Sequence, residues 1–176
     1  MTRNSIVSAA VLALAILVAG SQPVLAQDAP RDLPPEEAAE VRRAVVAWLE
    51  CEECEEGELE AVKKLGSSAV PTLNATLERG PSAASRDRVR RHLEDSYLKI
   101  AEHVKKNPEE KFDVSQEEYV KIYLENYSAN YRVRSAQALS AIGGESARKA
   151  LSTAVARKSQ REDVQLAIEA AAKAAK

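Results

Sequence analysis

The two cysteines of the chain, Cys51 and Cys54, are its sharpest candidates for chemistry, because they form a Cys-X-X-Cys arrangement. In an oxidising compartment, two such cysteines most simply form one local disulfide. A bridge at this place would close a turn between two helices. Its loop is small and restricts the unfolded chain less than a long-range bridge does, so we expect a stabilisation at the low end of the usual range.

Two functional roles stay open for the same pair. Thiol–disulfide exchange is one, because Cys-X-X-Cys is the reactive element of proteins with this activity. Its surroundings disfavour a thiolate, since seven glutamates and no basic residue lie between positions 50 and 60. Metal binding is the other, because two thiolates could hold zinc or copper if His92 or His103 completed the site. The leading interpretation is a structural disulfide, with no metal and no other cofactor.

Four tyrosines form a second feature, in a chain with one Trp, one Phe and five Tyr: Tyr119, Tyr123, Tyr127 and Tyr131. On one continuous helix, a spacing of four gives a slowly drifting stripe. Tyrosine is enriched at recognition surfaces because it offers a large contact area at low entropic cost. The same side chains can instead fill gaps between helices with their hydroxyls at the edge of the core, and a helix end around 128–130 would interrupt the stripe.

Charge is distributed unevenly along the chain. Residues 27–80 carry 6 basic and 13 acidic side chains, whereas residues 81–176 carry 18 and 14. A basic surface can dock an acidic partner or the Glu-rich turn of a second copy, although it can also be ordinary solvated helix surface. The overall net charge of −2 and the lack of a binding motif argue against a nucleic-acid partner. The candidate partner-binding residues are therefore the four tyrosines together with Arg132, Arg134, Arg148 and Arg157.

The first 26 residues are typical of an export signal, with Arg3 near the start, an apolar run over 6–19 and small residues up to Ala26. The apolar run is too short to span a bilayer comfortably, so we expect the signal to be removed and the product not to be stably inserted in a membrane. The expected product is periplasmic or secreted. In it, residues 27–34 form a flexible leader and residues 35–176 a single domain.

The composition of this domain predicts an all-α fold. Hydrophobic residues make up 45% of the chain and charged residues 30%, and the β-branched residues do not alternate as strands require. Two helix starts depend on single capping residues, Ser68 and Asn130. The expected helices cover about 36–50, 58–65, 69–78, a long one from Ser82 or Ser85 to 106, one from a capping box at Ser115 to 127, then 131–142, 145–158 and 163–175.

Two segments of the domain share one helix–glycine–helix plan. Alignment of Gly66 with Gly143 sets equivalent apolar residues against each other: Leu59, Val62 and Leu65 against Ala136, Leu139 and Ile142, and, after one inserted residue, Leu73 and Leu77 against Leu151 and Val155. The offset between the segments is about twice the roughly 40-residue period of two-helix solenoid repeats. This pattern indicates an internal repeat.

With this repeat, the sequence resembles the HEAT family, specifically the short HEAT-like repeats first described in bilin lyases. The stretch over 131–143 followed by 145–156 carries the best match, and the stretch over 65–73 carries the second. The resemblance implies a short right-handed α-solenoid of helical hairpins, whose usual work is protein–protein binding through a curved face. Bilin lyase activity is not implied, because many non-enzymes contain the repeat and nothing here marks a tetrapyrrole site.

Together these patterns predict an exported, non-enzymatic module that binds an unidentified protein partner. No Ser-His-Asp arrangement, phosphate-binding loop or paired carboxylate motif rises above chance in the sequence. Self-association through acidic and basic ends is a further hypothesis. The main alternative is a thiol/disulfide or metal-binding protein that uses Cys51 and Cys54.

Overall fold

The computed structural model describes residues 33–51, 54, 56–158 and 161–175, and every regular element in these ranges is a helix. The predicted all-α class is therefore confirmed for this part of the chain. The predicted export signal over 1–26 and nearly all of the predicted leader over 27–34 lie outside the described residues. The helices are α1 (Pro35–Glu50), α2 (Glu56–Leu65), the 3-10 helix η2 (Gly66–Ala69), α3 (Val70–Arg79), α4 (Ala83–Lys106), α5 (Gln116–Ile142), α6 (Gly144–Arg157) and α7 (Glu162–Ala174).

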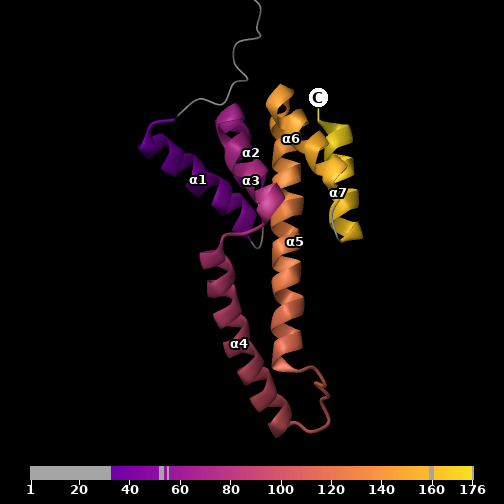
Figure 1. The fold of residues 1–176 in the computed structure, drawn as a ribbon. Helices are drawn as coiled ribbons and strands as arrows, with labels where there is room; N and C mark the ends of the chain where they lie inside the picture. The colour runs from indigo at the N-terminus through magenta and orange to yellow at the C-terminus, as the bar shows by residue number, and fades with distance from the viewer. Residues whose placement is uncertain (1–32, 52–53, 55, 159–160, 176) are drawn as a thin grey trace, which may run out of the picture.

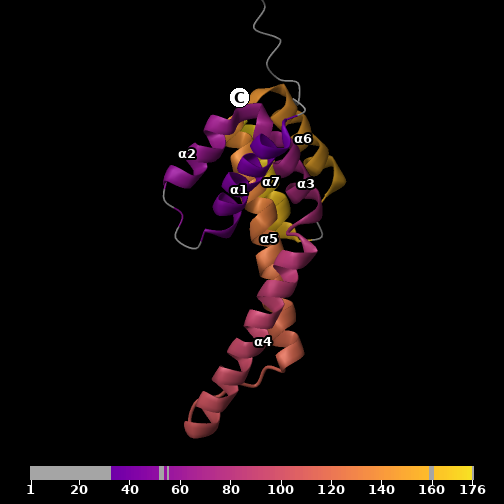
Figure 2. The ribbon, with the colours of Figure 1, turned by 90° about the vertical axis from the view of Figure 1, so that its left-hand side faces the viewer.

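The helices form two parts of different shape. In Figure 1, α1, α2, α3, α6 and α7 gather around the C-terminal half of α5, and we call this part the head. The helix α4 and the first half of α5 project from it as an antiparallel pair, which we call the hairpin (residues 83–126). Figure 2 shows the hairpin as a narrow stalk beneath the head. The described helices include none with the length and hydropathy of a membrane span.

The core of the head is built on α5, which contacts α1, α2, α3, α6 and α7. Apolar residues at helical spacing place one face of each helix toward this core. In α1 the buried positions recur at intervals of three and four, as the sequence predicts. The largest apolar side chains with no exposed surface come from six helices: Val45, Val62, Leu73, Leu139, Leu151 and Val164.

Glycine ends two of the helices in the segments that share the helix–glycine–helix plan. Gly66 and Gly143 have φ of +56° and +68°, in the left-handed region that glycine adopts without strain. The helices on the two sides of Gly66, α2 and α3, both pack against α5, and α3 also packs against α6. The two segments therefore share a helix-end conformation and lie against each other.

The predicted caps are confirmed in the hairpin. The side chain of Ser82 accepts a hydrogen bond from the backbone N–H of Ser85 (3.1 Å), and that of Ser115 accepts one from the N–H of Glu118 (3.2 Å). The predicted cap at Ser68 is wrong. That residue lies inside η2, whose backbone continues directly into α3, so no side chain caps the start of α3.

The predicted helix end around 128–130 is also wrong, because α5 is continuous through it. Asn130, expected as a cap, lies in the helix interior. Ser128 directs its hydroxyl back to the carbonyl of Leu124 (2.8 Å) instead of capping a new helix. Ala129 is only 4% exposed, because other helices of the head pack against this part of α5. Burial in the tertiary structure therefore outweighs the weak helix propensity of serine and asparagine.

Candidate functional site

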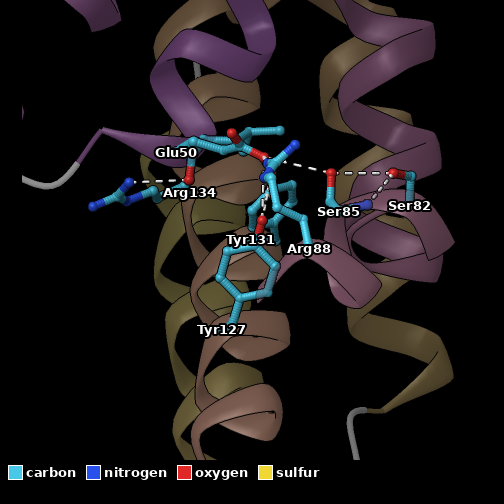
Figure 3. A network of polar contacts seen from close by, with 8 residues as sticks. Glu50, Ser82, Ser85, Arg88, Tyr127, Tyr131 and Arg134 are labelled. Carbon is cyan, nitrogen blue, oxygen red and sulfur yellow. Dashed lines mark hydrogen bonds and ion pairs between the residues drawn. The ribbon is translucent and has the colours of Figure 1, made fainter. Parts of the chain in front are cut away.

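The C-terminal end of α1 is where the head meets the hairpin. Its last residue, Glu50, turns its carboxylate toward α4 and α5 (Figure 3). The Oε1 atom accepts hydrogen bonds from the hydroxyls of Tyr127 (3.1 Å) and Tyr131 on α5. It also accepts one from the guanidinium of Arg88 on α4 (2.7 Å), and the hydroxyl of Ser85 lies 3.4 Å away. We call these five residues the Glu50 cluster.

The Glu50 cluster holds its carboxylate in the ionised form. Burial raises the pKa of Glu50, but the hydrogen bonds from Tyr131 and Tyr127 and the charge of Arg88 together outweigh it, so the pKa lies below its ordinary value. Burial, followed by the nearby carboxylate, raises the pKa of both tyrosine hydroxyls, which therefore stay neutral donors. The cluster is thus a charged joint between three helices, and the hydroxyl oxygens of Tyr127 and Tyr131 lie 3.0 Å apart.

A second joint lies beside it, where Arg134 of α5 closes the end of α1. Its Nη1 donates to the carbonyls of Leu49 (3.0 Å) and Cys51. The indole N–H of Trp48 donates in return to the carbonyl of Arg134 (3.1 Å), and the guanidinium lies 5.9 Å from the centre of the Trp48 ring. A cation at a helix C-terminus stabilises the last carbonyls and the helix dipole. Arg134 therefore acts inside the fold and not on an open surface.

The disulfide between Cys51 and Cys54 follows directly after this joint, with the Cα atoms 5.2 Å apart. It is consistent with the local bridge predicted from the sequence. Cys51 is half-buried and Cys54 is exposed. The guanidinium of Arg134 lies 3.6 Å from the sulfur of Cys51. The charged residues near Cys51 and Cys54 in the sequence are all glutamates. The tertiary structure adds a positive charge, that of Arg134, beside the disulfide.

The metal hypothesis requires a histidine near these cysteines. His92 and His103 are both exposed on α4, and His103 lies 3.2 Å from Glu110 at the far end of the hairpin. In the ranges that the structure describes, no group of three His, Cys, Asp or Glu side chains comes close enough to hold a metal ion.

The four tyrosines of the predicted stripe divide into two groups. Tyr127 and Tyr131 belong to the Glu50 cluster, and Tyr131 is only 3% exposed. Tyr119 and Tyr123 lie on the hairpin, with their ring centres 4.6 Å apart, and Tyr123 is 49% exposed. The stripe is therefore continuous along α5, but the head buries one half of it.

An aromatic cluster holds the far end of the hairpin together. The ring of Tyr119 lies 5.7 Å from that of Tyr97 on α4 and 6.0 Å from that of Phe112 in the connecting loop. The hydroxyl of Tyr97 donates to the carbonyl of Val114 in the same loop (3.0 Å). These contacts fix the loop against both helices.

The other predicted arginines lie apart from one another. Arg157 forms an ion pair with Glu78 (2.8 Å) that joins α6 to α3, and Arg148 is exposed on α6. Arg132 on α5 lies between two hollows of the surface. The structure therefore does not bring the four predicted arginines into one site.

The wider of these hollows lies between α4, α5 and the N-terminal end of α7, and we call it the hairpin groove. It has a volume of about 940 Å³. Its floor is apolar, and its rim is charged with both signs. The floor is lined by Leu124, which is half-buried, and by Val120, Ala129 and Val164, which are at most 4% exposed. The rim carries the cations Arg86, Arg90, Lys121, Arg132 and Arg161 and the anions Glu94, Glu117 and Glu125.

Of the residues predicted from the sequence to bind a partner, only Arg132 lines the hairpin groove. Arg86 and Arg90 were missed, although their spacing of four places both on one face of a helix. Glu50 has no such signal, because it is one of seven glutamates between positions 50 and 60. Its partners lie 35 to 81 positions away in the chain.

Comparison of the chain with protein families, with characterised proteins and with solved structures finds no match.

Proposed function

We propose that this protein is an exported, non-enzymatic module that binds another protein, and that the hairpin groove is its binding face. The groove carries the proposal, because it combines an apolar floor with a charged rim, which is the anatomy of protein-recognition sites. The Glu50 cluster and the aromatic cluster hold its walls at both ends. Export is supported by the signal-like residues 1–26 and by the disulfide, which persists in oxidising compartments.

The proposal includes a HEAT-like architecture for the head. In this architecture, two helical repeats form a short right-handed solenoid. The first repeat is α2 with α3, and the second is the last part of α5 with α6. The matched glycines and the packing of α3 against α5 and α6 support this assignment. The hairpin is then an insertion between the two repeats, and it supplies a binding surface that the repeats alone do not have.

Site-specific photo-crosslinking tests the binding face. A photoreactive amino acid would replace Lys121, on the rim of the groove, and separately Lys99, an exposed lysine of α4 outside it. We expect position 121 to give a discrete crosslinked protein in the producing cells and position 99 to give none. Equal products from both positions, or none from either, would overturn the assignment of the binding face.

A second candidate function is thiol–disulfide exchange, which the contact between Arg134 and the sulfur of Cys51 favours. A thiolate of a partner dithiol would attack the exposed sulfur of Cys54, and Cys51 would leave as a thiolate beside the guanidinium. The second thiolate of the partner would then attack the partner's sulfur in the mixed disulfide, and Cys54 would leave as a thiolate. The partner would be oxidised to a disulfide and this chain reduced to a dithiol.

The reaction of the protein with reduced dithiothreitol separates this candidate from a structural bridge. Rapid reduction that slows at least tenfold in Arg134→Gln supports exchange, because the guanidinium stabilises the leaving thiolate. Resistance to mild reductant, with no dependence on Arg134, supports a structural bridge.

A further inference from the structure

We propose that the partner segment of the hairpin groove is an amphipathic helix with an acidic end, which lies lengthwise between α4 and α5. This inference rests on the proposed function and names the class of partner. Its acidic residues would meet the cations near the head, its basic residues would meet the glutamates of the rim, and its apolar side would cover the floor.

The cations of the rim carry the first step. Arg88 and Arg157 are paired with glutamates of this chain, but four rim cations form no ion pair within the described residues: Arg86, Arg90, Lys121 and Arg132. Arg86 and Arg90 are exposed on the face of α4 that borders the groove. Cations on a rim that their own chain does not neutralise attract the carboxylates of a partner.

Arg132 adds an independent observation at the end of the groove nearest the head. Its side chain is half-buried, and its Nε atom is buried with no hydrogen-bond partner. Because this Nε atom has no accessible surface, a partner in the groove would meet Arg132 through the rest of its guanidinium group. A carboxylate that enters from the groove offers an acceptor of matching geometry to a guanidinium.

The distribution of charge favours a helix over a uniform polyanion. Because α4 and α5 are antiparallel, Arg86 and Arg132 border the end of the groove near the head, whereas Glu94 and Glu117 border the part nearer the hairpin tip. Between them on α5, Lys121 and Glu125 continue the alternation of sign along the rim. A nucleic acid or a sulfated glycan carries negative charge along its whole length, so these glutamates would repel it. It would also gain nothing from the apolar floor.

The spacing along the rim favours a helix over an extended peptide. Arg86, Arg90 and Glu94 follow one another at intervals of four on α4, and Glu117, Lys121 and Glu125 do so on α5. Rows of this kind run along their helices and leave a groove into which the ridges of a third helix fit. The row on α4 extends over eight residue steps, from Arg86 to Glu94, which is about 12 Å or roughly two turns of the bound helix.

The test uses a fluorescein-labelled 16-residue peptide with Leu at helical spacing, Glu in its first half and Lys in its second half. Its binding to the exported protein is followed by fluorescence anisotropy. We expect saturable binding in the micromolar range that weakens at least tenfold in the double variant Arg86→Glu, Arg90→Glu. The matched control Arg91→Glu, Lys99→Glu makes the same charge change on exposed residues of α4 outside the groove, so binding should change less than twofold.

Two control peptides test the floor and the charge separately. Replacement of every Leu by Ser should weaken binding, because Leu124 on the floor then loses its apolar cover. Replacement of every Glu by Lys should abolish it. Circular dichroism of both double variants checks that α4 remains helical.

Four outcomes would overturn the inference. Equal losses in the two double variants would show attraction by net charge alone. Tighter binding of heparin or duplex DNA than of the peptide, with the same dependence on Arg86 and Arg90, would identify a polyanion as the occupant. A partner crosslinked at position 121 whose capture does not depend on these arginines would refute the acidic helix and leave the proposed function standing, whereas no crosslink and no peptide binding would refute both.

Discussion

The head and the hairpin are made from the same kind of helix but are held in different ways. In the head, several helices surround α5, and its residues Ala136, Ala138 and Leu139 have no exposed surface. In the hairpin, Leu93 is the one buried residue among the 24 residues of α4, and α5 contributes Val120. Neither belongs to the core of the head. A two-helix stalk has too little apolar surface for a core of its own, so its two ends must hold it.

This difference indicates that the stability of the fold and the proposed binding surface depend on different parts of the molecule. The packed head can tolerate little change in volume. The hairpin buries few residues and carries most of the charged rim of the proposed binding groove. Elements with few buried contacts open at lower free energy than a core does, and binding surfaces are drawn from them. The Glu50 cluster is the place where the two parts are coupled.

Removal of a core side chain from the head gives the largest expected effect. Leu139 has no exposed surface, so Leu139→Ala should lower the free energy of unfolding by about 2–5 kcal/mol through lost burial and a cavity. Leu93→Ala in the hairpin should lower it by less than about 2 kcal/mol, because its surroundings can collapse. Urea unfolding followed by circular dichroism measures both. A larger loss for Leu93→Ala would show that the hairpin carries the global stability.

Removal of the joint should separate the two parts. In Glu50→Ala, the hydroxyls of Tyr127 and Tyr131 lose their common acceptor, and we expect a loss of about 1–3 kcal/mol. Amide hydrogen exchange should become faster over 83–126 and stay unchanged in α6 and α7. The control Glu102→Ala removes an exposed carboxylate of α4 that pairs only with Lys106, and should change stability by less than about 0.5 kcal/mol. Uniformly faster exchange would argue against a separate hairpin.

Removal of the disulfide should have a smaller effect that stays inside the head. The bridge closes a loop with a sequence separation of 3, so Cys51→Ser with Cys54→Ser should cost about 2 kcal/mol or less. Exchange in the hairpin should not change, because Arg134 still holds the carbonyl of Cys51. Faster amide exchange in the hairpin of this variant would contradict this expectation. It would show that the disulfide positions Glu50 and so contributes to the coupling between the head and the hairpin.

The smallest expected effect is a dependence of the joint on pH. The pKa of Glu50 in the folded protein lies below its ordinary value of 4.5, so its charge stabilises the fold above that value. This contribution is lost as the pH falls through the lowered pKa. The difference in unfolding free energy between the wild type and Glu50→Gln should therefore be largest at neutral pH and shrink from about pH 5 downward. A difference that stays constant with pH would show that charge plays no part.

The sequence predicts the ends of most helices because the signals are local. Ser82 and Ser115 bond to N–H groups three positions away, and glycine at 143 adopts a backbone conformation of its own. The predicted helix end at 128–130 is wrong because the contacts that decide it are not local. Nothing near Asn130 in the chain indicates that other helices cover this stretch of α5 and keep it helical.

The sequence by itself determined the helical class, the places where most helices begin and end, and the closeness of Cys51 to Cys54. Each of these depends on residues within about four positions of one another, where backbone geometry and capping act. The tertiary structure decided which side chains meet: Arg134 at the end of α1, Glu50 with two tyrosines of α5, and the rim of the hairpin groove. Those contacts join residues up to 86 positions apart, and they depend on how the apolar faces pack, which no local pattern specifies.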